Sequence, residues 1–139
     1  VAAAAPAAAP PAAGASAAAA AAYVFDPAKG QALFTSNCAA CHQASGEGVP
    51  GAFPPLKGNA AVLDADPTLH LGTILQGAHG KTIGGATYGS AMPPFASQLS
   101  DREIADIANH ERTACGNSAK PVTPAEVATL RAKAPGAGK

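Results

Sequence analysis

Apolar residues recur at helical spacing in four stretches of the chain, and each stretch follows a signal that starts helices. Two of these signals pair an aspartate with a proline. The other two are capping boxes, in which a serine or threonine precedes a glutamate by three positions. The sequence therefore predicts helices over residues 27–39, 67–76, 101–115 and 124–133, with a shorter helix over residues 59–63.

The segments between these helices are rich in glycine and proline. Residues 46–59 contain four glycines and three prolines, which predicts a loop. Residues 81–90 (KTIGGATYGS) predict either a short hairpin or an irregular loop. Gly30 lies one helical turn before Phe34, where it either lets another helix approach or is simply tolerated. The pattern as a whole predicts an all-α fold with about four to five helices.

Residues 1–22 are almost entirely alanine, and prolines interrupt the first half of this segment. It has no charged or large side chain and cannot build a packed core, so we expect a tether or linker. Alanine is only weakly apolar, which argues against a membrane span. The chain is thus expected to divide into this tether, a globular domain over residues 23–120, and a C-terminal helical extension with a frayed tail over residues 121–139.

Charge and composition exclude several classes of function. Nine basic and nine acidic residues give a net charge of zero, and no basic run suggests nucleic acid or a membrane surface. The chain has only six aromatic residues and no tryptophan. A domain with so few large side chains would be marginally stable without a bound apolar group.

The segment Cys38-Ala-Ala-Cys41-His42 carries the strongest chemical signal. Cys-x-x-Cys-His is the attachment sequence for c-type haem, in which two thiols bind the porphyrin and the histidine binds iron. A zinc site would need a second pair of ligands, and the remaining cysteine, Cys115, stands alone. A thioredoxin-like pair would need an alternating β/α pattern, which this sequence lacks.

The second iron ligand decides the chemistry of such a haem. Met92 is the only methionine and lies in a proline-rich loop. This position favours iron ligation over a role in filling the core. His79, in a flexible loop, is the main alternative. His70 and His110 are expected on helices, facing solvent or a neighbouring helix. A thioether opposite an imidazole raises the haem potential and leaves no open position on iron.

These motifs resemble the class I cytochromes c. Gly30 and Phe34 match the family's glycine–aromatic pair, and Ile107 and His110 fall where its last helix would meet them. The match narrows to the small bacterial cytochromes c that donate electrons to haem–copper terminal oxidases; similar domains occur in quinoprotein dehydrogenases. The segments that carry this narrower resemblance are residues 46–56, the Met92 loop, and residues 103–105, 109–110, 123–127 and 130–133. The resemblance implies helices wrapped around one covalently attached haem c.

Residue roles follow from this resemblance by position. Cys38 and Cys41 would hold the haem, and His42 and Met92 would bind iron. A loop carbonyl, assigned to Pro55 with Pro54 as the alternative, would accept a hydrogen bond from His42 Nδ1. Further residues expected at the cofactor are Phe53, Leu56, Tyr88 and Phe95, of which Tyr88 either reaches a propionate or simply packs.

The function implied is electron transfer in the periplasm by a monomeric, non-enzymatic carrier, soluble or tethered to the membrane through its N-terminal segment. Its expected partners are a terminal oxidase and an upstream reductase or dehydrogenase. The alternative is a cytochrome c subunit of a periplasmic quinoprotein or molybdenum dehydrogenase. A catalytic or sensory haem protein would need an open sixth position, against which Met92 argues. One departure is Cys115, where the family often has tryptophan; it is either a small buried residue or an exposed thiol able to form an intermolecular disulfide.

Overall fold

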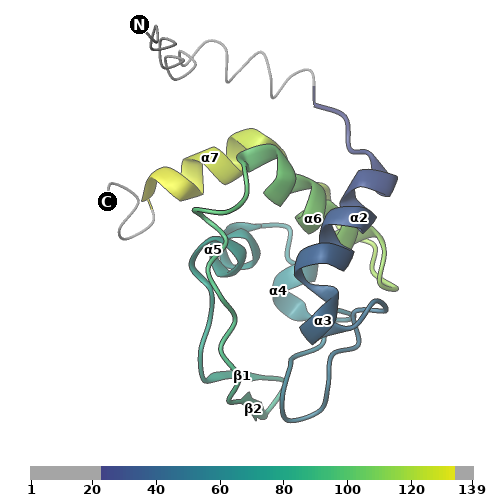
Figure 1. Ribbon diagram of the computed structural model, residues 1–139, viewed down its shortest axis with the longest axis vertical. Helices are drawn as coiled ribbons and strands as arrows, with labels where there is room; N and C mark the ends of the chain where they lie inside the picture. The colour runs from purple at the N-terminus through teal and green to yellow at the C-terminus, as the bar shows by residue number, and fades with distance from the viewer. Residues whose placement is uncertain (1–22, 134–139) are drawn as a thin grey trace, which may run out of the picture.

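The computed structural model describes residues 23–133, and its fold is built mainly from helices (Figure 1). The expected tether over residues 1–22 and the expected frayed tail lie outside these residues. The described elements are α2 (Pro27–Asn37), α3 (Ala39–His42), α4 (Ala60–Leu63), α5 (Thr68–Gln76), β1 (Lys81–Ile83), β2 (Ala86–Tyr88), α6 (Asp101–Thr113) and α7 (Pro124–Lys133). The two strands pair antiparallel, so residues 81–90 form the hairpin rather than the irregular loop.

The capping signals start the helices close to the predicted positions. Asp26 caps α2 by accepting hydrogen bonds from the backbone N–H groups of Ala28 and Lys29. Ser100 and Glu103 form both bonds of the capping box at the start of α6. The helix expected from residue 67 begins one residue later, at Thr68, with Pro67 at a ψ of 3° before it. Asp66 accepts a hydrogen bond from the Thr68 N–H at 3.0 Å.

Two helices, α2 and α6, cross at Gly30. A Cβ atom on Gly30 would lie only 2.7 Å from the carbonyl oxygen of Asp106, so the glycine is needed for this close approach. One turn further along α2, the Phe34 ring lies 4.9 Å from the ring of His110. Phe34 and Ile107 also share a buried cluster. Of the two interpretations of Gly30, helix contact is confirmed.

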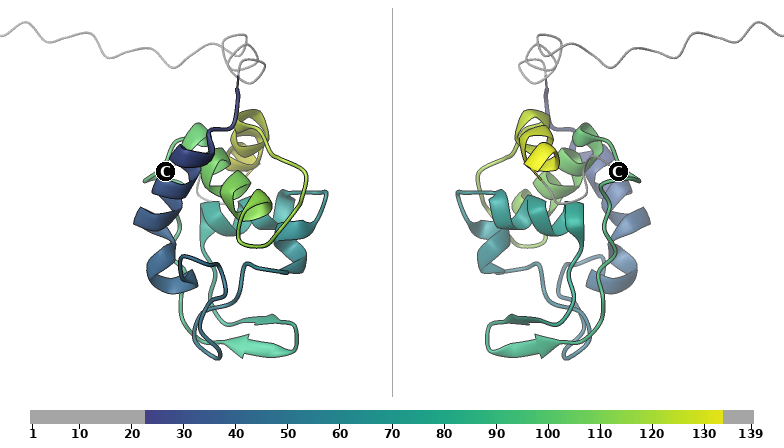
Figure 2. Two further views of the ribbon diagram at one scale, coloured as in Figure 1. Left: turned by 90° about the vertical axis from the view of Figure 1, so that its right-hand side faces the viewer. Right: turned by 90° about the vertical axis from the view of Figure 1, so that its left-hand side faces the viewer.

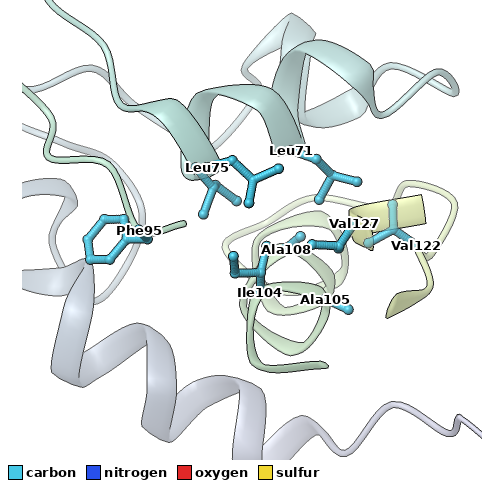
Figure 3. Close-up of a cluster of buried hydrophobic side chains, with 9 residues drawn as sticks. Leu71, Leu75, Phe95, Ile104, Ala105, Ala108, Val122 and Val127 are labelled. Atoms are coloured by element: carbon cyan, nitrogen blue, oxygen red, sulfur yellow. The ribbon is translucent and has the colours of Figure 1, made fainter. Parts of the chain in front are cut away.

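A second cluster joins α5, α6 and α7 (Figure 3). Leu71 and Leu75 of α5 point toward Ile104 and Ala108 of α6, and Val127 of α7 closes one side. The segment beyond residue 120 therefore packs into the same core as the preceding helices. The hairpin lies at the other end of the molecule from α7 (Figures 1 and 2). Between residues 23 and 133, no helix has the length and apolar character needed to cross a membrane.

Candidate functional site

The short helix α3 presents the Cys-x-x-Cys-His residues on one turn. Its first turn is fixed by hydrogen bonds from the Cys38 N–H to the Phe34 carbonyl at 2.8 Å and from the His42 N–H to the Cys38 carbonyl at 2.9 Å. Cys38 and His42 are buried, and Cys41 is half-buried. Both cysteines are free thiols. Burial, helped by the charges of Glu111 and Cys41, raises the pKa of the Cys38 thiol, so it is protonated at neutral pH.

His42 is oriented by a loop carbonyl. Its Nδ1 lies 2.8 Å from the carbonyl oxygen of Pro54. Because a carbonyl oxygen only accepts, Nδ1 carries the proton and Nε2 keeps a free lone pair. This corrects the assignment to Pro55 by one residue. The Pro55 carbonyl instead accepts a hydrogen bond from Asn59 Nδ2 at 2.9 Å.

The segment that carries Met92 is held against the C-terminal end of α5. Gly77 ends this helix with a φ of +76°, and a Cβ there would collide with the Met92 carbonyl oxygen. Ala78 and Met92 then exchange two backbone hydrogen bonds, of 3.1 and 2.7 Å. Further along, the Phe95 N–H donates to the Ile74 carbonyl at 3.0 Å. The methionine backbone is therefore fixed although it belongs to no helix or strand.

These segments meet in one cleft that is partly open to solvent, with about 910 Å³ of space between its walls when the open side is included. Its lining is mostly apolar. Nearly every cofactor-binding residue expected from the sequence lines it, with Pro55 the exception: Cys38, Cys41, His42, Phe53, Leu56, Tyr88, Met92 and Phe95.

The donor set in this cleft fits a covalently attached haem. It offers two thiols on one turn, an imidazole whose Nε2 is free, and a thioether in a fixed segment. The apolar lining suits a porphyrin ring. Within residues 23–133, no three His, Cys, Asp or Glu side chains gather into a group able to hold a metal ion by themselves. The zinc alternative therefore gains no support there.

The other histidines occupy different surroundings. His79 lines the cleft but is exposed to solvent. His110 makes the expected helix contact, through Phe34. Its half-buried position lowers its pKa, although the charge of Glu111 acts to raise it. His70 also makes a helix contact, with Glu111 of α6, and in addition lines the cleft.

That His70 and Glu111 belong to the cleft was not expected from the sequence. A signal was present, because Glu111 stands seven positions after Ile104 and four after Ile107, on the same helical face. His70 likewise precedes Ile74 by four positions on α5. Polar residues at core-facing positions of two helices indicate a buried pair, provided that the two helices pack on each other.

Cys115 behaves more like a small apolar residue than an exposed thiol. It is half-buried and packs against the cluster that contains Phe34 and Ile107. Its backbone has a φ of +53° just after α6 ends, and a Cβ on Gly46 would lie 2.9 Å from its sulfur. Burial raises the pKa of this thiol, with Glu111 adding to the effect. These contacts favour the first of the two interpretations of Cys115.

Comparison with known proteins agrees with the geometry of the cleft. The family model described as cytochrome c matches residues 27–113. Cytochrome c-552 of Thermus thermophilus is 41% identical over 115 residues, which cover 76% of this chain and 86% of the relative. The cytochrome c subunit of the quinone alcohol dehydrogenase of Gluconobacter oxydans is 40% identical over 90 residues, 65% of this chain but only 19% of the subunit. The cytochrome c subunit of gluconate 2-dehydrogenase from Pantoea cypripedii is 34% identical over 110 residues, 76% of this chain and 24% of that subunit. The chain therefore belongs to the cytochrome c family, whose members carry electrons through a covalently attached haem c.

Proposed function

We propose that Cys38 and Cys41 would hold the haem covalently and that His42 and Met92 would bind its iron. The observation that carries this proposal is the shared cleft, in which His42 Nε2 is left free by the bond from Nδ1 to Pro54. The haem supplies a one-electron ferric–ferrous couple, and the histidine–methionine pair raises its potential. With His42 and Met92 both bound to the iron, the chain would act as a carrier rather than as a catalyst.

The surrounding residues keep these ligands in place during electron transfer. The hydrogen bond to Pro54 fixes the ring orientation of His42 and increases the basicity of its Nε2. The backbone pairing with Ala78 restricts the position of Met92. Neither contact involves a group that gains or loses charge with the iron. Little rearrangement therefore accompanies oxidation or reduction, which favours fast transfer.

The optical spectrum of the purified protein tests this ligand set. We expect haem that stays with the chain after acid–organic extraction, and a weak far-red band of ferric iron bound to thioether. Covalent haem without that band would point to His79 or to an open position. Absence of covalent haem from protein made with a haem-attachment system would overturn the proposal.

For the partners, we propose that the chain works in the periplasm and passes electrons from an upstream reductase or dehydrogenase to a haem–copper terminal oxidase. The similarity to cytochrome c-552 supports a small carrier of this kind, because it covers most of that relative. Stopped-flow mixing of the reduced protein with a purified haem–copper oxidase tests it. Reoxidation with saturable kinetics is expected; no reoxidation would exclude this acceptor.

A second candidate function is that of a cytochrome domain serving a dehydrogenase. The similarity to subunits of quinone alcohol dehydrogenase and gluconate 2-dehydrogenase favours it. Reduction of the oxidised protein by a purified quinoprotein dehydrogenase and its substrate would support this candidate. The same stopped-flow instrument measures both reactions, so the two rates can be compared directly.

A further inference from the structure

His70 of α5 and Glu111 of α6 form a buried polar pair. His70 Nε2 lies 2.5 Å from Glu111 Oε2, and each side chain is only 4% exposed. Leu71, Ile74 and Ala108, their neighbours on these two helices, belong to the hydrophobic core. A buried ionisable pair in such surroundings contributes little net stability and is often replaceable by apolar residues. Stability alone therefore does not explain its presence.

The position of the pair connects it with the haem. Both residues line the cleft described above. The other charged residue of that lining, Lys81, is exposed to solvent. Among the described residues, His70 Nδ1 is buried without a hydrogen-bond partner. The cleft therefore contains a dehydrated carboxylate and imidazole whose charge solvent screens only weakly.

We propose that His70 and Glu111 together bind one proton whose affinity depends on the oxidation state of the haem. With the proton, the imidazolium and carboxylate have no net charge; without it, the pair has one negative charge. When the carrier accepts an electron from its donor, the pair takes up a proton from water. The added negative charge at the iron is thereby balanced, and oxidation releases the proton again.

Other titratable groups surround the pair but differ from it. The charge of Glu111 reaches Cys38, His110 and Cys115. Cys38 would lose its titratable proton on thioether formation, while His110 and Cys115 do not line the cleft. The guanidinium of Arg112 donates to the carbonyls of Val62, Asp64 and Lys120. The remaining titratable groups on the packed elements are Lys29 on α2, Asp64 at the end of α4, Asp101, Arg102, Glu103 and Asp106 on α6, and Glu126, Arg131 and Lys133 on α7. In the cleft lining they are Cys41, His42, His79, Lys81 and Tyr88.

The proposal gives a definite direction for the midpoint potential. Because reduction favours the protonated pair, the potential must fall as pH rises through the range in which the pair loses its proton. One proton per electron sets the upper limit at about 59 mV per pH unit, the value of a tenfold change for a one-electron couple. The potential is therefore followed over a window of about pH 5 to 8.

Spectroelectrochemical titration of the holoprotein across this window tests the proposal. The double variant His70→Leu/Glu111→Leu replaces the pair by apolar side chains, a change that cores often tolerate. We expect the native protein to show a falling potential and the double variant a nearly flat one. His110→Phe is the matched control, because it removes a histidine outside the cleft and keeps the aromatic contact with Phe34. It should retain the native slope.

If the double variant does not fold, Glu111→Gln serves instead, since the amide keeps a hydrogen bond to His70 but removes the charge. Loss of the slope in either variant, with the covalent haem retained, supports the proposal. A native potential that does not change across the window would overturn it. So would an unchanged slope in the variants, which would assign the proton to haem propionates or to another residue.

Discussion

His42 and Met92 reach the same cleft from distant segments. Hydrogen bonds to backbone groups position each of the two residues. The Pro54 carbonyl fixes the imidazole from one side, and the Ala78 backbone pairs with that of Met92. Neither contact depends on a long flexible side chain. Substituting either of these proposed ligands should therefore change the haem chemistry more than the fold.

Met92→Ala should open the sixth coordination position. We expect loss of the far-red band, a lower midpoint potential and binding of carbon monoxide to the reduced protein at neutral pH. Stability should fall by about 2 kcal/mol, the lower end for truncation of a core methionine, because Met92 is only half-buried. Optical and electrochemical titrations measure these changes. Persistence of the far-red band would show that Met92 is not the ligand.

His79→Asn provides the matched control for this variant. His79 lines the same cleft but is exposed, so its loss should leave the band and the potential unchanged. If Met92→Ala fails to bind carbon monoxide, the combination of both substitutions would reveal whether His79 replaces the thioether.

Candidate haem-binding residues could be named from the sequence where the signal is local. The Cys38 to His42 motif and the single methionine required no tertiary information. The choice between Pro54 and Pro55 did require tertiary information, because their loop is irregular and no periodicity fixes which carbonyl faces His42. The pairing of His70 with Glu111 also depends on how α5 and α6 pack, which neither helix specifies alone.

At the scale of helices, the crossing of α2 and α6 depends on one missing side chain. Gly30→Ala would place its Cβ 2.7 Å from the Asp106 carbonyl oxygen and 2.7 Å from the Phe25 ring. The backbone oxygen cannot move without shifting α6, so we expect a loss of about 1–3 kcal/mol, typical of overpacking. Chemical denaturation of the holoprotein measures this loss.

Gly72→Ala on α5 is the matched control for this prediction. A Cβ at Gly72 meets nothing within 4 Å, so the variant should gain about 0.5–1 kcal/mol from helix propensity. Opposite signs for the two glycines would separate steric contact from propensity. A gain in stability for both would contradict the close approach of α2 and α6.

Helix starts could be predicted because capping is a local interaction, as Asp26, Ser100 and Glu103 illustrate. Helix ends were less accurate. The first helix was expected to reach Ala39, yet α2 ends at Asn37 and α3 begins anew, with Cys38 at a φ of −122° between them. Such a break depends on how the following loop closes over the cleft, which is a tertiary effect.

Across the whole molecule, α7 is connected to the segment that links Met92 to α6. The guanidinium of Arg131 donates to the Asp101 carboxylate at 2.7 Å and to the carbonyls of Leu99 and Ala96. Hydrogen bonds from a charged group are worth about 1.5–3 kcal/mol. Arg131→Gln should therefore destabilise the protein by about 2 kcal/mol, measured by denaturation.

A comparison with Arg102→Gln separates the contribution of these hydrogen bonds to stability from the effect of losing a positive charge. Arg102 is exposed and lies over the Tyr23 ring at 5.3 Å, a contact worth about 0.5–1 kcal/mol at such sites. Equal losses in the two variants would show that Arg131 contributes only its charge. A larger loss for Arg131→Gln would assign the difference to its contacts with the segment beyond Met92.

The net charge of zero affects how the whole molecule meets a partner. Electrostatic steering accelerates association by about 10- to 1,000-fold where charges are strongly complementary. A neutral carrier lacks most of this effect, so its rate of transfer to a haem–copper oxidase should change by less than about tenfold between low and high salt. Stopped-flow oxidation across ionic strengths measures this dependence.

Ser90 offers a way to locate the docking face in the same experiment. It is exposed and lines the cleft. Ser90→Lys and Ser90→Glu add opposite charges there, so at low salt they should shift the transfer rate in opposite directions. The difference should vanish near 1 M salt, where the screening length is about 3 Å. A steep salt dependence of the native protein would show that local charge clusters, rather than net charge, govern association. Identical rates for the two Ser90 variants at low salt would place the docking face away from the cleft.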